Sequence, residues 1–237
     1  MTLTKHIPNT ITSMNLLSGV MGVICALNGE MGLAFVLMLA AAVFDFCDGL
    51  AARLLHAYSP IGKELDSLAD LVSFGVLPTL MLVKTMQMHG NTGLTSYLPL
   101  FLVAMSALRL AKFNVDERQT TDFLGMATPT SAMICGSLCC YIGLTTDSAL
   151  HAWAGSIWFL PVLALILGLL LVSEIPMFGM KIAKGHKLLD GKRIVFLCLA
   201  AAAIGFVAIA GLNWSLAVLL IFSTYTVENL ILAVLRR

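Results

Sequence analysis

Long runs of apolar residues, separated by short polar segments, dominate the chain. The runs are continuous rather than alternating, and most are near the twenty residues that an α-helix needs to cross a bilayer. The pattern therefore predicts an all-α polytopic membrane protein, with a single transmembrane domain over residues 1–237. We expect about eight transmembrane helices, at residues 11–28, 31–54, 65–88, 96–112, 127–146, 155–179, 193–211 and 214–235.

The composition agrees with helices in a membrane. Of the 237 residues, 59% are hydrophobic and 11% are charged, whereas a soluble domain carries about 25% charged residues. Only helices and closed barrels satisfy their backbone groups in lipid, and unbroken apolar runs favour helices. The net charge of +1 gives no reason to expect nucleic acid as a partner. The six cysteines lie in apolar runs without a paired spacing, and we assign them no role.

The basic residues indicate how the chain crosses the membrane. In this arrangement of spans, only Lys84 of the fourteen lysines and arginines falls toward one side. Because cytoplasmic loops carry the excess of lysine and arginine, we expect both termini at the cytoplasmic face of the cytoplasmic membrane. The residues on that side are Lys5, Arg53, Lys63, Arg109, Lys112, Arg118, Lys181, Lys184, Lys187, Lys192, Arg193, Arg236 and Arg237.

The segment DFCDGLAARLLHAYSPIGKELDSLAD, residues 45–70, places four carboxylates beside or inside apolar runs. Charge within a membrane segment is costly, so it marks a functional site by default. Asp45 and Asp48 are three residues apart, and Asp66 and Asp70 are four apart, so each pair falls on one face of a helix. With a short turn at Ser59-Pro60 between the two helices, the four carboxylates can be directed into one space at the cytoplasmic end.

Four carboxylates in one space repel each other. Two like charges about 4 Å apart cost on the order of 4 kcal/mol at an effective dielectric constant near 20. A hard divalent cation such as Mg²⁺ or Mn²⁺ relieves this repulsion and prefers carboxylate oxygens. The sequence therefore predicts a metal site near one membrane face. The alternative is a set of structural ion pairs, but one arginine, Arg53, cannot neutralise four aspartates.

Polar residues before and after this segment are further candidates. Asn9, Thr12 and Asn15 recur every three residues and form one polar stripe, which serves either as a helix cap or as a ligand contact. Arg109 and Lys112 are one turn apart at a helix end. They either extend toward lipid headgroups or bind a phosphate or carboxylate.

Two other acidic residues, Glu174 and Glu228, lie in apolar segments. We expect Glu174 in the sixth span and Glu228 in the eighth, each paired with a nearby lysine or arginine. The five histidines are scattered without the spacing of metal ligands, and none is a candidate for the general base.

The residues from 45 to 70 also form a longer pattern, Asp45-x2-Asp48-Gly49-x2-Ala52-Arg53-x8-Gly62-x3-Asp66-x3-Asp70. At every position this pattern resembles the signature of the CDP-alcohol phosphatidyltransferase family. Members of that family transfer a phosphatidyl-type group from a CDP-linked lipid to an alcohol and release CMP. The segments IPNTITSMNLLSG, GKELDSLADLVSFGVLP, RLAKFN and MATPT are similar to the serine-using branch of the family, the integral-membrane phosphatidylserine synthases of bacteria.

The resemblance implies roles for individual residues. Asp45, Asp48 and Asp66, together with Asp70, would hold Mg²⁺ or Mn²⁺, and Asp70 would be the general base. The nucleotide or its lipid would be contacted by Asn9, Thr12, Gly49, Ala52, Arg53 and Gly62. The substrates would be CDP-diacylglycerol and L-serine, in phospholipid biosynthesis among membrane lipids, and the resemblance also allows a homodimer. From its charge and position, Arg109 is our candidate for binding the serine carboxylate.

Two alternatives stay open. Within the same family the acceptor could be glycerol 3-phosphate or an inositol type, since Arg109, Lys112 and Arg118 offer positive charge for a phosphorylated acceptor. A cation transporter also uses acidic residues inside the membrane. A transporter, however, places them along a midplane path, commonly with repeated or broken helices. Here the acids cluster toward one face and no repeat is found.

Overall fold

The computed structural model describes the whole chain except residues 1–5, 117–122, 147, 179–190 and 236–237. Two very short strands, β1 (Phe123–Leu124) and β2 (Pro176–Met177), form an antiparallel pair. The rest of the regular structure is helical: α1 (His6–Leu27), α2 (Met31–Leu54), α3 (Pro60–Asp70), the π-helical segment η2 (Leu71–Val76), α4 (Leu77–Met88), the 3₁₀ segment η3 (Leu94–Leu100), α5 (Phe101–Val115), α6 (Thr128–Leu144), α7 (Ala149–Ala154), α8 (Phe159–Val172), α9 (Gly191–Ile209) and α10 (Trp214–Leu235).

The prediction of a helical membrane protein is confirmed, but the count of eight spans is not. Within the described residues, six helical stretches are long and apolar enough to cross a membrane: His6–Leu27, Met31–Leu54, Pro60–Met88, Leu94–Val115, Gly191–Ile209 and Trp214–Leu235. The predicted spans at 127–146 and 155–179 correspond to shorter helices, α6 with 17 residues and α8 with 14.

The predicted span at 155–179 is too long at both ends. At 1.5 Å per residue, the 14 residues of α8 cover about 21 Å, less than the ~30 Å hydrocarbon core. Beyond α8 the chain pairs with the β1 segment instead of continuing the helix, since the Gly125 N–H donates to the Ile175 carbonyl at 2.9 Å. Pro176 then disfavours any return to helix. Hydropathy misses this end because the residues around it are still largely apolar.

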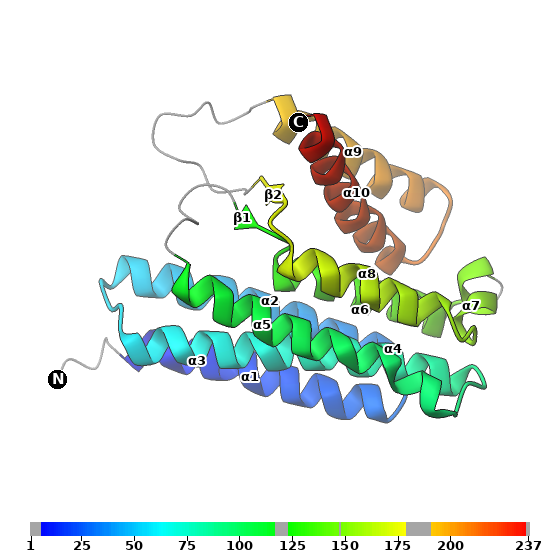
Figure 1. The fold of residues 1–237 in the computed structure, drawn as a ribbon, viewed down its shortest axis with the longest axis horizontal. Helices are drawn as coiled ribbons and strands as arrows, with labels where there is room; N and C mark the ends of the chain where they lie inside the picture. The colour runs from blue at the N-terminus through cyan, green and yellow to red at the C-terminus, as the bar shows by residue number, and fades with distance from the viewer. Residues whose placement is uncertain (1–5, 117–122, 147, 179–190, 236–237) are drawn as a thin grey trace.

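Helices α1 to α6 and α8 lie side by side in a bundle, the short α7 lies at its right-hand end, and α9 and α10 form a tilted hairpin against it (Figure 1). Helix α6 is the most enclosed element, with 14 of its 17 residues buried. It packs against α2, α4 and α10. The largest fully buried side chains around it include Phe35, Met38, Phe74 and Met81.

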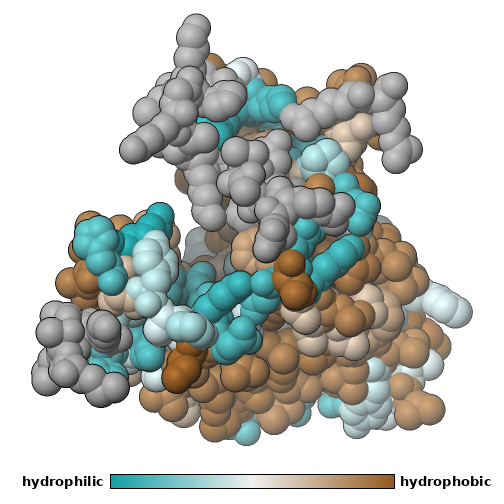
Figure 2. All heavy atoms as spheres, turned by 60° about the vertical axis from the view of Figure 1, so that its left-hand side comes forward, coloured by the Kyte–Doolittle hydropathy of each residue, from teal (hydrophilic) through white to brown (hydrophobic). Residues whose placement is uncertain are grey.

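One end of this bundle carries the motif. The end of α2, the start of α3 and the end of α5 lie together at the left of Figure 1. Ser59 caps α3 by accepting a 3.0 Å hydrogen bond from the Gly62 N–H, and Pro60 occupies the first turn, so the predicted turn at these residues is confirmed. Figure 2 turns this end toward the viewer and shows hydrophilic side chains gathered there, next to hydrophobic side chains on the flank.

The third predicted span is interrupted rather than uniform. Directly after Asp70 the helix widens into the π-helical turn η2 and then resumes as α4. Pro78, in the first turn of α4, has no N–H to donate and cannot take part in a regular α-helical ladder at that point. π-helical turns of this kind are frequent at functional sites.

Candidate active site

The structure brings the four aspartates of the motif together. Asp45 and Asp48 project from α2, and oxygens of Asp45, Asp48 and Asp66 lie within 4.8 Å of one another. Asp70 lies one turn beyond Asp66 at the end of α3, close enough for its charge to interact with the charges of Asp45 and Asp66. Asp48 and Asp70 are buried, and Asp45 and Asp66 are half-buried. Two helix ends therefore direct four carboxylates into one space.

These carboxylates suit a hard divalent cation. Asp48 Oδ2 and Asp66 Oδ1 are both buried and have no hydrogen-bond partner among the described residues. A buried polar oxygen without a partner is unfavourable, so each of these atoms calls for a ligand. The donor set consists only of carboxylate oxygens, the type that Mg²⁺ and Mn²⁺ prefer. No described lysine or arginine forms an ion pair with the cluster, which speaks against the structural alternative.

A cavity of about 190 Å³ opens beside the cluster, between α1, α2 and the start of α3. Asp48 and Asp66 border it. Asp45, one turn before Asp48 on α2, and Asp70, one turn after Asp66 on α3, are not part of its lining. Of the residues expected to contact the nucleotide, all but Arg53 line this cavity: Asn9, Thr12, Gly49, Ala52 and Gly62. Tertiary structure thus collects residues from three helices around a single space next to the acids.

The two glycines of the motif have different structural roles. A Cβ atom at Gly62 would lie 3.0 Å from both Asn9 Oδ1 and Ser59 Oγ, so glycine lets α1 and α3 approach closely. A Cβ atom at Gly49 would meet nothing within 4 Å. The missing side chain at Gly49 leaves room at the cavity wall, where a bulky substituent would take space from a ligand.

The two candidate arginines lie outside this cavity. Arg53 is exposed, and its Nε donates to the Gly49 carbonyl of its own helix at 2.9 Å. Arg109 is half-buried on α5, with its guanidinium carbon 4.9 Å from the ring centroid of Phe113. The charge of Arg109 interacts with that of Asp70. Arg109 is therefore associated with the deeper part of the acidic cluster rather than with the cavity.

Asn15 also belongs to the site, although the sequence placed it only in the polar stripe and not among the residues expected to contact the nucleotide. Its side chain is fully buried, and its Nδ2 donates a 3.3 Å hydrogen bond to Asp70 Oδ1. The available signal was the polar stripe on α1, in which Asn15 follows Asn9 and Thr12 at the same interval. The first two line the cavity, whereas Asn15 contacts the carboxylate behind it.

Glu174 pairs as expected but lies elsewhere than predicted. It follows the end of α8 instead of lying within a span, because the helix stops at Val172. Its Oε1 is 3.7 Å from Lys112 Nζ, and both side chains are largely exposed. Exposed ion pairs of this kind contribute little to stability.

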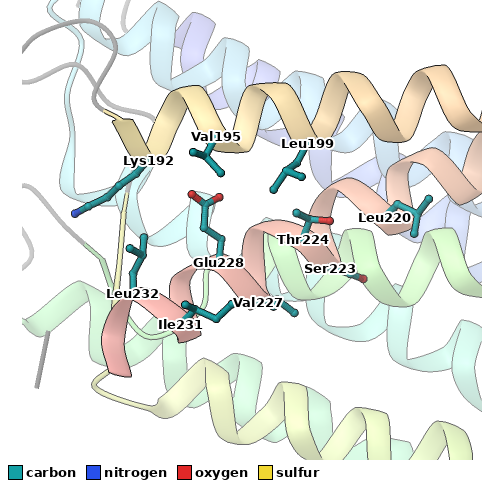
Figure 3. Close-up of a pocket in the computed structure, with 10 residues that line it drawn as sticks. All are labelled: Lys192, Val195, Leu199, Leu220, Ser223, Thr224, Val227, Glu228, Ile231 and Leu232. Atoms are coloured by element: carbon teal, nitrogen blue, oxygen red, sulfur yellow. The ribbon is translucent and has the colours of Figure 1, made fainter. Parts of the chain in front are cut away.

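A second, more apolar cavity lies away from the acidic cluster. It has a volume of about 610 Å³ and lies between α9 and α10 (Figure 3). Glu228 points between the two helices, and Lys192 is directed away from it. Glu228 Oε2 is buried and no described residue pairs with it, so the expected ion pair is not found there. With one carboxylate in an apolar lining, this cavity lacks the donor set of the motif.

Comparison with known proteins agrees with the geometry. The family described as CDP-alcohol phosphatidyltransferase matches residues 5–172. Three similar proteins are each called CDP-diacylglycerol–serine O-phosphatidyltransferase. The one from Mycobacterium bovis is 35% identical over 72% of this chain and 60% of its own length. The one from Helicobacter pylori is 32% identical over 81% of this chain and 80% of its own. The one from Methanocaldococcus jannaschii is 30% identical over 71% and 72%.

The matched region contains α1 to α8, and therefore all four aspartates and every residue that lines the acidic cavity. The chain spans about 60% of the length of the mycobacterial relatives. The hairpin of α9 and α10 lies beyond the family match. On the combined grounds of motif, geometry and sequence match, the chain belongs to the CDP-alcohol phosphatidyltransferase family.

Proposed function

We propose that the protein is a phosphatidylserine synthase, which transfers the phosphatidyl group of CDP-diacylglycerol to the hydroxyl of L-serine and releases CMP. One observation carries the proposal: unpartnered carboxylate oxygens of Asp48 and Asp66 border a cavity lined by small and polar residues. The names of the relatives support serine as the acceptor.

The cavity is the proposed place of the nucleotide. Gly49 and Ala52 on α2 have small side chains and leave space for a ligand. Asn9 and Thr12 supply polar groups on α1. Bare carboxylates would repel the pyrophosphate of the substrate. Mg²⁺ or Mn²⁺ held by Asp45, Asp48, Asp66 and Asp70 would neutralise this charge and the charge that develops on the departing CMP.

Asp70 is the proposed general base. The serine hydroxyl is a poor nucleophile at neutral pH, and a carboxylate within reach takes its proton as attack proceeds, an effect worth roughly 10²–10⁴-fold. The serine oxygen forms a bond to the phosphorus attached to diacylglycerol. The bond from that phosphorus to the CMP oxygen breaks, and its electron pair leaves with CMP.

Arg109 is the proposed partner of the serine carboxylate. A guanidinium matches a carboxylate with two parallel hydrogen bonds. The Phe113 ring supports the guanidinium, and the charge of Arg109 acts on Asp70. An acceptor bound by Arg109 would hold its hydroxyl near the base, on the side of the cluster away from the nucleotide cavity.

The proposed site faces the cytoplasm, where serine and CMP are soluble and the acyl chains remain in lipid. Arg53, Lys63, Arg109 and Lys112 lie at the motif end of the bundle, and Lys84 lies near the other end. The other basic residues used for this orientation include seven outside the described residues: Lys5, Arg118, Lys181, Lys184, Lys187, Arg236 and Arg237. We also propose a homodimer, which mass measurement in detergent would test.

The test is CMP release by the purified protein. CDP-diacylglycerol is supplied with serine, glycerol 3-phosphate or inositol in turn, with and without Mg²⁺ or Mn²⁺. We expect metal-dependent release with serine, and a rate that is lower by roughly 10²–10⁴-fold in Asp70→Asn. Release only with another acceptor would overturn serine while keeping the family chemistry. Folded protein that releases no CMP with any acceptor, but conducts cations in liposomes, would overturn the proposal as a whole.

A further inference from the structure

Asn15 is the only member of the polar stripe on α1 that contacts the acidic cluster from behind the cavity. Its side chain is fully buried and does not line the cavity, in contrast to Asn9 and Thr12. Its Nδ2 donates to Asp70 Oδ1 at 3.3 Å. Asn15 therefore has no surface to offer a substrate in this geometry, and its contact with the site runs through Asp70.

The backbone of Asn15 is held as well as its side chain. Ser73, a fully buried residue of η2, donates its hydroxyl to the Asn15 carbonyl at 3.2 Å. One turn later on α1, a Cβ atom at Gly19 would lie 3.0 Å from the Ser73 Cα, so glycine permits the close approach. Asn15 thus donates one hydrogen bond to Asp70, the last residue of α3, and accepts one from Ser73 in η2. The two hydrogen bonds lie on either side of the point where α3 passes into the π-helical turn.

A purely structural role does not account for an asparagine here. The Asn15 Oδ1 atom is buried and has no hydrogen-bond partner among the described residues. An unpartnered buried acceptor destabilises a fold, and a leucine, which has the same branched arrangement of side-chain heavy atoms, carries no such acceptor. The amide gains only one described side-chain contact in return, and that contact is with Asp70.

We infer that Asn15 is a positioning residue for Asp70, and this inference rests on the proposed function. By donating to Oδ1, the amide fixes the rotation of the carboxylate, so that the second oxygen is presented to the serine hydroxyl. A neutral amide can do this without forming an ion pair that would neutralise the base. Ser73 and Gly19 keep α1 at the distance from η2 that this hydrogen bond requires.

The test compares Asn15→Leu with a matched control, Asn229→Leu. Asn229 is equally buried, and its amide joins the Phe178 N–H to the Tyr225 carbonyl at 2.8 Å each, with no carboxylate involved. For Asn15→Leu we expect kcat for CMP release to fall by roughly 10- to 100-fold, the scale of a misplaced catalytic group. The KM for CDP-diacylglycerol should stay unchanged, because Asn15 does not line the cavity. The Mn²⁺ affinity measured by titration should fall no further than it does in Asp70→Asn. Asn229→Leu should lower the melting temperature and leave kcat per folded molecule unchanged.

A double-mutant cycle with Asp70→Asn tests whether the effect runs through Asp70. Adding Asn15→Leu to Asp70→Asn should leave kcat at the value for Asp70→Asn alone. Multiplicative losses in the cycle, or a loss in Asn15→Leu that only follows the folded fraction, would overturn the inference. An altered KM or Mn²⁺ affinity at constant kcat would also overturn it, since Asn15 would then act on a ligand. Absence of CMP release in the wild-type protein would instead count against the proposed function.

Discussion

Asn114 Nδ2 donates a 2.9 Å hydrogen bond to Oγ of Ser67, the neighbour of Asp66 on α3. The Asn114 carbonyl also accepts a 2.8 Å hydrogen bond from Lys63 Nζ. The last residue of the segment RLAKFN thereby ties the end of α5 to the helix that carries two of the four aspartates. These two hydrogen bonds hold the end of α5, the helix that carries Arg109, against α3.

Removing this tie should disturb the site more than the fold. In Asn114→Ala, the loss of one partly buried hydrogen bond should cost about 1 kcal/mol and lower the melting temperature by about 2–4 °C. CMP release should fall further than the melting temperature explains. Thr95→Ala is the control, because it removes a 2.9 Å hydrogen bond to Asn91 at the other end of the bundle. Equal activity in the two variants would show that the tie does not serve the site.

The acidic cluster should be unstable without a cation. In Asp66→Asn one of four neighbouring charges is removed, so the melting temperature in chelator should rise by a few degrees, since like charges this close cost up to about 4 kcal/mol. The stabilisation by added Mn²⁺ should shrink, and CMP release should fall by at least about 100-fold.

The control for this experiment is Glu64→Gln, which removes an exposed carboxylate from the same helix. It should change neither the melting temperature in chelator nor the response to Mn²⁺. Scanning calorimetry or a thiol-independent melting assay measures both. A melting temperature for Asp66→Asn that falls in chelator would contradict the predicted repulsion.

A large side chain at position 49 should weaken substrate binding without destabilising the fold. In Gly49→Leu the new Cβ atom has no neighbour within 4 Å and the rest of the side chain takes up cavity space, so the KM for CDP-diacylglycerol should rise on the order of tenfold or more. Gly205→Leu is the control, because Gly205 is a helical glycine with equally open surroundings on α9. We expect similar melting temperatures for both variants. A KM raised equally in both would locate the effect outside the cavity.

The guanidinium of Arg109 should matter for serine more than for the lipid. Arg109→Lys keeps the charge but loses the two parallel hydrogen bonds, so the KM for serine should rise about tenfold, which corresponds to about 1.4 kcal/mol. The KM for CDP-diacylglycerol should not change. Lys112→Met serves as the control, since it removes a neighbouring charge whose described partner is the exposed Glu174. An unchanged KM for serine in folded Arg109→Lys would remove Arg109 from the acceptor site.

Much of the candidate site could be predicted from the spacing of residues that are close together in the sequence. The intervals within each aspartate pair imply one face of a helix. The turn predicted at Ser59 and Pro60 is confirmed, although the helix that follows begins at Pro60 and not near residue 65. The same logic placed Asn9 and Thr12 on one face of α1, and both line the acidic cavity. These features depend on contacts within a few residues, which the sequence states directly.

The role of Asn15 and the length of α8 depended on distant partners. Asn15 belongs to the stripe visible in the sequence, but its partner Asp70 is 55 residues away. The residues after α8 pair through their backbone with β1, a segment some fifty residues earlier in the chain. The apolar sequence continues beyond Val172, so hydropathy alone does not indicate that the helix ends there.

The sequence by itself determined that the chain is helical and membrane-spanning and that its acids form two pairs, each on one face of a helix, because composition, period and spacing are local properties. The family followed from the resemblance of the motif and from the match over residues 5–172. Only the tertiary structure decided that Asn15 reaches Asp70, that Arg109 lies by the deeper acids while Arg53 turns away, and that α8 is short. Each of these depends on how close two remote segments approach, and that distance is set by the packing of the whole bundle rather than by either segment alone.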